Sequence, residues 1–115
     1  MRKVLIVERI DAYRSIYEKQ FAEAGFEVLF ANTAEEGIRL FRENSDIVVA
    51  SVGSRIPGNL ELVKEMRAAR PTLPIIATSL IPELRAELKQ AGCNEEVSDK
   101  TSLLSAVAEI IRDQP

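Results

Sequence analysis

The chain has 115 residues, of which 46% are hydrophobic and 29% are charged, and its net charge is −3 at pH 7. This length predicts a single domain over residues 1–115, and the interspersed charges argue against direct binding of nucleic acid. The absence of histidine excludes His-based acid–base catalysis, and a lone cysteine, Cys93, excludes an internal disulfide. Because the apolar runs are far shorter than a membrane span, we expect a cytoplasmic protein with no membrane partner.

Short apolar runs predict five buried strands along the chain. Strands that are covered on both faces of a sheet read as continuous apolar stretches rather than alternating ones. The expected strands are 3–7, 27–30, 46–51, 74–79 and a weak one at 95–98.

Helical spacing of apolar residues follows each of these runs. We expect helices over 11–24, from 34 through Phe41, over 59–69, from Pro82 to Gly92, and over 101–112. Thr33 and Glu36 form a capping-box pattern. Strands alternating with helices predict the α/β class, with a parallel sheet covered on both faces and a crevice beyond the C-terminal ends of its strands.

The last predicted helix carries two apolar stripes. One consists of Leu103, Ala106 and Ile110, and the other of Leu104, Val107 and Ile111. One stripe can pack on the sheet while the other stays partly exposed as a contact surface, or both can be buried.

Polar residues at the predicted strand ends are the candidates for chemistry. The segment DIVVAS, residues 46–51, reads as a buried strand that places Ser51 at its C-terminal tip. The other candidates are Glu8 and Arg9 after the first strand, Ser79 after the fourth, and Asp99 or Lys100 after the fifth.

The segments KVLIVERIDAYR, DIVVASVGSRIPGNLELVKEMR, PIIATSL and AGCNEEVSDKTSLL occur in an order and spacing that resemble the receiver domain of two-component response regulators. The resemblance covers nearly the whole chain and implies a flavodoxin-like fold with a five-stranded parallel sheet and five helices. In that family a phosphohistidine donates its phosphoryl group to an aspartate at the end of strand three. Acids after strand one hold Mg²⁺, and a Thr or Ser after strand four and a lysine after strand five contact the phosphoryl group.

The resemblance assigns these roles to particular positions of this chain, several of which depart from the family pattern. Ser51 falls at the phospho-acceptor position, Glu8 and Arg9 at the acidic pair, and Ser79 at the switch hydroxyl. The lysine position falls on Asp99 by gap-free counting, or on Lys100 with one extra loop residue, which we prefer. The position expected to hold a switch aromatic carries Glu96, and Leu80 replaces a small residue and should narrow the crevice entrance.

These departures weaken both the metal site and the acceptor. Arg9 brings a positive charge beside the position of the metal, where a unit charge at about 4 Å contributes roughly 4 kcal/mol at an effective dielectric near 20. Mg²⁺ binding should therefore be weak or absent, and Arg9 could pair with Glu8 instead. A serine needs a base or a metal to become nucleophilic, so Ser51 is expected only to fill the space of an aspartate.

The sequence therefore predicts a pseudo-receiver that is neither an enzyme nor dependent on a cofactor. It should act as a phosphorylation-independent interaction module in phosphorelay-type signalling, contacting signalling proteins or a second copy through the last helix, the fourth helix and the fifth strand. One alternative is a receiver that still responds to phosphorylation through Ser51 or Arg9. Another is a small-ligand or nucleotide-binding protein of flavodoxin-like fold. The ending IIRDQP fits either a complete chain or part of a longer regulator.

Overall fold

The computed structural model describes residues 2–114, so the two ends of the predicted domain, Met1 and Pro115, lie outside it. Within these residues the strands form one parallel sheet in the order β2-β1-β3-β4-β5. The strands are β1 (Lys3–Val7), β2 (Glu27–Ala31), β3 (Ile47–Gly53), β4 (Ile75–Thr78) and β5 (Glu95–Val97). The predicted α/β class and parallel sheet are confirmed.

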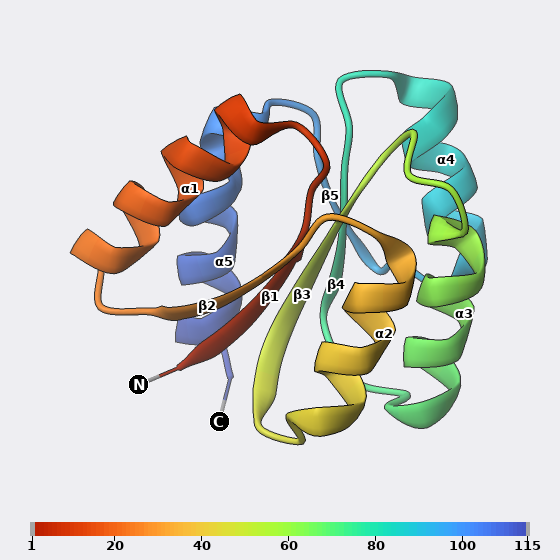
Figure 1. Cartoon of the computed structure of the whole chain (residues 1–115), viewed down its shortest axis with the longest axis horizontal. Coiled ribbons are helices and arrows are strands. Elements are labelled where there is room, and N and C mark those ends of the chain that lie inside the picture. Colours follow the sequence, from red (N-terminus) through yellow and green to blue (C-terminus); the bar gives the residue numbers. More distant parts are fainter. Residues whose placement is uncertain (1, 115) are drawn as a thin grey trace.

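The helices cover the sheet in two layers. They are α1 (Asp11–Glu23), α2 (Ala34–Glu43), α3 (Asn59–Ala69), α4 (Pro82–Ala91) and α5 (Leu103–Arg112). Figure 1 shows α1 and α5 on one face of the sheet and α2, α3 and α4 on the other. The strand order reverses between β1 and β3, which places a crevice at the C-terminal ends of these strands. In residues 2–114, no helix combines the length and apolarity needed to cross a bilayer.

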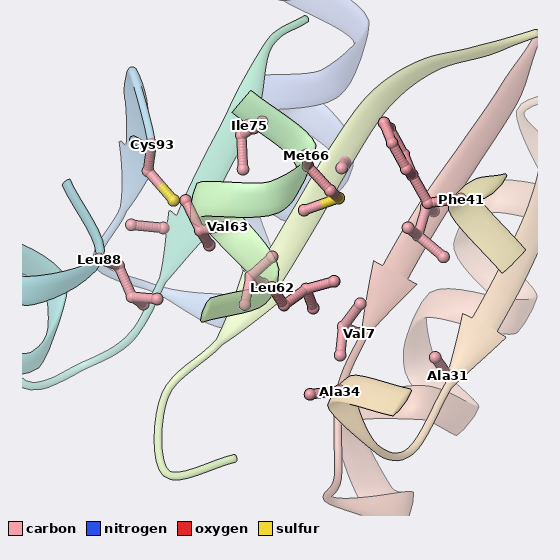
Figure 2. Packing of buried hydrophobic residues seen from close by; sticks show 14 of the residues in the cluster. Val7, Ala31, Ala34, Phe41, Leu62, Val63, Met66, Ile75, Leu88 and Cys93 are labelled. Carbon is pink, nitrogen blue, oxygen red and sulfur yellow. The ribbon is translucent and has the colours of Figure 1, made fainter. Parts of the chain in front are cut away.

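Each face of the sheet has its own apolar core. On the face of α2 to α4, Val7 from the sheet belongs to the same cluster as Leu62, Val63 and Met66 from α3, and all four are buried (Figure 2). The opposite face is built around Tyr17, Phe21, Ile76, Leu103 and Val107. Burying a large apolar side chain contributes about 1.5–3 kcal/mol, so these two layers supply most of the stabilisation of the fold.

In two helices, apolar residues that lie close together in the sequence differ in burial. In α1, Tyr17 and Phe21 are buried, whereas Ile16 is 39% exposed. Residues four apart lie on one helix face, and the residue next to Tyr17 is turned about 100° away from it, so Ile16 cannot follow the same line. In α3, Leu62 is buried and Leu60 is half-buried.

The start of α2 follows the predicted capping box closely. The N–H of Glu36 donates to Thr33 Oγ1 at 3.1 Å, and the N–H of Asn32 donates to Glu36 Oε1 at 3.0 Å. The carboxylate thus reaches back one residue further than the pattern requires, and the turn before the helix is closed by two side-chain hydrogen bonds.

The start of the last predicted helix is different. Lys100–Ser102 form a 3-10 turn, and α5 begins only at Leu103. Leu103 and Val107, one from each predicted stripe, are buried, while the other apolar residues of both stripes are half-buried: Leu104, Ala106, Ile110 and Ile111. The buried line therefore combines the two stripes instead of choosing one of them.

Candidate functional site

A buried ion pair closes the C-terminal end of the sheet. Glu8 follows β1, and its Oε1 accepts a hydrogen bond from Lys100 Nζ at 2.8 Å. Its other oxygen, Oε2, accepts from the N–H of Ile10 at 3.2 Å. The Glu8 and Lys100 side chains are 3% and 7% exposed. Both oxygens of the carboxylate are therefore engaged inside the protein.

Of the two candidates for the lysine position, Lys100 is the residue that reaches the crevice. Its Nζ lies 4.5 Å from the centroid of the Tyr13 ring, in addition to its bond with Glu8. Asp99 instead starts the 3-10 turn, where its carboxylate accepts from the hydroxyl and the N–H of Thr101. These bonds lower the pKa of Asp99 below its usual value.

Ser51 does not lie at the tip of strand three, so this prediction is wrong. β3 runs two residues further, to Gly53, and Ser51 is paired inside the sheet between Ile6 and Ile76. Ser51 is 2% exposed, and its hydroxyl shares a hydrogen bond of 2.6 Å with the hydroxyl of Thr78. A buried serine with a hydrogen-bond partner can lie within a strand, so its polarity did not mark the end.

Gly53 occupies the tip of β3 and has no side chain to offer to the crevice. A Cβ atom at this position would lie 3.4 Å from Glu8 Oε1 and 3.3 Å from the carbonyl oxygen of Val7. Gly53 therefore lies directly beside the Glu8 carboxylate at the end of strand three. Sequence reasoning missed it because glycine carries no functional group, and the continuing apolar residue Val52 was the only sign that the strand went on.

Arg9 does not pair with Glu8, which corrects the alternative reading of this segment. The Arg9 side chain is exposed and forms no ion pair with residues 2–114. Successive side chains of an extended chain point to opposite sides, so Glu8 turns inward and Arg9 outward. The partner of Glu8 comes instead from the far end of the sequence, in Lys100.

Ser79 follows β4 and is fully buried in a local network. Its hydroxyl donates to Ser54 Oγ at 3.0 Å and accepts from the N–H of Ile81 at 3.1 Å. The next residue, Leu80, is 59% exposed. Leu80 lines a cavity of about 160 Å³ at the crevice entrance, where Lys100 also contributes.

Glu96 lies away from the crevice, on the surface of β5. Its carboxylate accepts hydrogen bonds from Lys89 Nζ at 2.6 Å and Arg85 Nε at 3.2 Å. These two cations, Lys89 first, lower the pKa of Glu96. The predicted switch position is thus held by an exposed ion-pair cluster with α4.

Comparisons with known proteins place this geometry among solved structures. No family model matches the chain, and no curated protein matches it. A two-component response regulator from Clostridium difficile superposes with a TM-score of 0.85 at 19% identity, covering 98% of both chains. The chemotaxis protein CheY4 from Vibrio cholerae gives 0.82 at 23% identity, covering 96% of this chain and 98% of that one. The fold is that of a response-regulator receiver domain.

A third neighbour was solved in complex with Mg²⁺ and beryllofluoride. This is the response regulator TrrA from Thermotoga maritima, with a TM-score of 0.83 and 22% identity over 96% of this chain and 99% of that chain. Identities this low show a common receiver fold.

The crevice residues do not fit Mg²⁺ in the manner that the receiver resemblance implies. Mg²⁺ takes oxygen ligands, usually from one or two carboxylates with waters and phosphate. Here Glu8 already accepts from Lys100 and Ile10, Arg9 stands where a second acid would be, and Gly53 contributes no side chain. Within residues 2–114 there is no cluster of three or more His, Cys, Asp or Glu side chains suited to a metal ion.

The hydroxyl of Tyr17 is a second unusual feature beneath the crevice. Tyr17 is 1% exposed, and its hydroxyl has no hydrogen-bond partner among residues 2–114. Burial raises the pKa of this phenol, and the charge of Glu8 adds to the effect. A buried hydroxyl without a partner destabilises the folded state by about 1–3 kcal/mol.

We therefore expect Tyr17→Phe to raise the free energy of unfolding by about 1 kcal/mol, measured by urea denaturation at pH 7. Because the pKa of Tyr17 is raised on folding, wild-type stability is fully present below the ordinary tyrosine pKa of 10.0 and falls as pH rises above it. The variant should lose part of this alkaline decline. A Tyr17→Phe protein less stable than wild type would mean that the hydroxyl has a partner.

Proposed function

We propose that this chain is a receiver domain of two-component signalling that acts as a protein-interaction module and has lost phosphoryl transfer. The proposal rests on two adjacent features of the crevice: strand β3 ends in a glycine, and the carboxylate beside that glycine already has a lysine partner. Gly53 ends β3, and Glu8 beside it is held by Lys100.

The chemistry of phosphoryl transfer requires a nucleophile at the crevice. Gly53 has no side chain, and Ser51 is buried and bonded to Thr78, so neither offers an accessible oxygen. A serine would also need a nearby base, and the carboxylate of Glu8 is engaged by Lys100. These observations count against a receiver that responds to phosphorylation at Ser51. Arg9 is exposed, and none of its contacts favours a response to phosphorylation through that residue.

The same residues support a protein that is not an enzyme and needs no Mg²⁺. The ion pair between Glu8 and Lys100 has no net charge. The other polar groups of the crevice include the hydroxyls of Ser54 and Ser79, which are hydrogen-bonded to each other. Such a crevice has no charge left to attract a divalent cation. We propose that this crevice keeps the domain in a single conformation.

The interaction surface that we propose consists of α4, β5 and α5. A groove of about 460 Å³ runs between β5 and α5. Its apolar residues are Ile76, Val97, Ala106 and Ile110, and its acidic residues are Glu95, Glu96, Glu109 and Asp113. β5 lies at the end of the sheet and pairs with β4 alone, so one side of its backbone is open in residues 2–114. A groove lined by apolar and acidic residues beside an open strand edge suits contact with a signalling protein or a second copy.

Loss of phosphoryl transfer is tested by incubating the chain with acetyl phosphate and Mg²⁺ and measuring its intact mass. We expect an unchanged mass under conditions in which an active receiver is fully modified. A Mg²⁺-dependent phosphate adduct on any side chain of the crevice would overturn this part of the proposal.

The proposed surface is tested by filling the groove. Ala106→Arg should abolish self-association in sedimentation experiments and the capture of signalling proteins on the immobilised chain, because the larger side chain occupies the groove between α5 and β5. Ile16→Ser, an exposed apolar position on α1, is the matched control and should leave both unchanged. Equal behaviour of the two variants would argue against this surface.

A further inference from the structure

One arginine of α4 bridges the loop after β4 and strand β5. Arg85 Nη1 donates to the carbonyl oxygen of Ser79 at 2.8 Å, and its Nε donates to Glu96 Oε1 at 3.2 Å. The Arg85 side chain is 16% exposed. Because the donors of a guanidinium group are fixed in one plane, the two bonds together constrain how far the Ser79 carbonyl can move from Glu96.

The sequence places these groups on facing surfaces. Arg85 and Lys89 are four residues apart and therefore lie on one side of α4. Val97 is buried in the core that contains residues of α1 and α5, so its neighbour Glu96 points to the opposite face of the sheet, on which α4 lies (Figure 1). The Glu96 carboxylate can thus accept from both cations of the helix, and it accepts from Lys89 Nζ at 2.6 Å.

The loop after β4 is connected to the crevice and to β5 as well as to Arg85. The hydroxyl of Ser79 donates to Ser54 and accepts from the N–H of Ile81. The N–H of Ser79 donates to the carbonyl oxygen of Val97, on β5, at 3.2 Å. Displacing this loop from β5 therefore requires that the bonds of Ser79 to Arg85 and to Val97 break together.

The two cations of α4 are not equivalent in this arrangement. An exposed ion pair contributes little to stability by itself, and the Glu96 side chain is 45% exposed. Arg85 differs from Lys89 because its second bond goes to a part-buried backbone carbonyl. Within residues 2–114, Lys89 bonds to Glu96 but not to Ser79. The main effect of Arg85 is therefore expected on local opening between the loop and β5 rather than on global unfolding.

We infer that Arg85 is a positioning residue that holds the loop after β4 and strand β5 in one arrangement, and with them the α4 and β5 part of the proposed interaction surface. This inference rests on the proposed function, which places partner contacts on α4, β5 and α5. A permanent bridge of this kind would keep the surface in one conformation without a phosphoryl signal at the crevice. Removing the bridge should let the loop separate from β5 while the rest of the domain stays folded.

The test is native-state hydrogen exchange of the whole chain, followed by NMR at two amides at the same end of the sheet. The Ser79 N–H donates to Val97 beside α4, and the Glu8 N–H donates to Ala31 at 2.9 Å between β1 and β2. We expect Arg85→Met to accelerate exchange at Ser79 at least about tenfold and to leave Glu8 within about twofold of wild type. A general loss of stability would accelerate both amides.

Two further variants separate the bridge from the charge. Lys89→Met removes the other cation bound to Glu96 and should leave exchange at Ser79 within about twofold of wild type. Arg85→Lys keeps the positive charge, but one ammonium group lacks the planar fork that reaches both partners. We expect Arg85→Lys to accelerate exchange at Ser79 at least about threefold, and this variant also serves if Arg85→Met does not fold.

Several results would overturn the inference. These are unchanged exchange at Ser79 in Arg85→Met and Arg85→Lys, equal acceleration at Ser79 and Glu8, or an effect of Lys89→Met as large as that of Arg85→Met. The measurement uses neither phosphate nor a partner protein. A phosphate adduct in the mass experiment would therefore overturn the proposed function separately from this result.

Discussion

The Lys100→Met variant is expected to lose about 3–5 kcal/mol of unfolding free energy, because it leaves the Glu8 carboxylate buried without its cation. For a domain of this size the loss corresponds to a fall of roughly 12–20 °C in melting temperature. Urea and thermal unfolding, followed by circular dichroism, measure it directly. The effect is large because the Glu8 side chain is only 3% exposed.

A second variant distinguishes loss of the ion pair from damage to packing. Glu8→Gln combined with Lys100→Met removes both charges and keeps similar volumes, so most of the lost stability should return. Glu8→Gln alone should cost less than Lys100→Met, because Lys100 lines the open cavity and its ammonium group can move toward water. If the double variant is no more stable than Lys100→Met, the loss of stability does not come from an unpaired Glu8 carboxylate.

Introducing an aspartate at position 51 or at position 53 of β3 should destabilise the fold to different extents. Ser51→Asp is expected to destabilise the fold by about 3 kcal/mol or more, because it places a charge beside Thr78 in the buried sheet. Gly53→Asp is expected to fold at a smaller cost, because this position ends the strand and a Cβ atom 3.3 Å from the carbonyl oxygen of Val7 requires a shift of only a few tenths of an ångström.

The Gly53→Asp variant should also gain a response to Mg²⁺. Its carboxylate would stand beside Glu8, so two acids would share the crevice with Lys100. We expect Mg²⁺ affinity to rise at least about tenfold over wild type, equivalent to about 1.4 kcal/mol, measured by NMR titration. If Ser51→Asp gains Mg²⁺ affinity and Gly53→Asp does not, the assignment of Gly53 to the strand tip is wrong.

The elements of the fold could be predicted from the sequence because each depends on local pattern. The run KVLIV gives β1 without ambiguity, and Thr33 and Glu36 mark the start of α2 with side chains that bond to the backbone beside them. Pro82 and Gly92 bound α4 for reasons of backbone geometry that neighbouring residues cannot alter.

The crevice was predicted in part, because its geometry depends on contacts across the whole chain. Register with the last helix favours Lys100 at the lysine position, but its partner Glu8 lies 92 residues away, and no local sequence pattern predicts that hydrogen bond. A polar residue after an apolar run predicts a strand end at Ser51, which the structure contradicts. The bond of Ser51 to Thr78 on the next strand, a tertiary contact, is what allows the strand to continue.

The proposal that the crevice binds neither Mg²⁺ nor a phosphoryl mimic is tested most directly by amide NMR. The wild-type chain is titrated with Mg²⁺ and then with beryllofluoride, the combination present in the Thermotoga maritima TrrA structure. The proposed function predicts no shift at Glu8, Gly53, Ser79 or Lys100 at millimolar Mg²⁺, and none after beryllofluoride is added. Saturable shifts clustered at these four residues would show a crevice that still binds metal and phosphoryl mimic, and would contradict the claim that phosphoryl transfer has been lost.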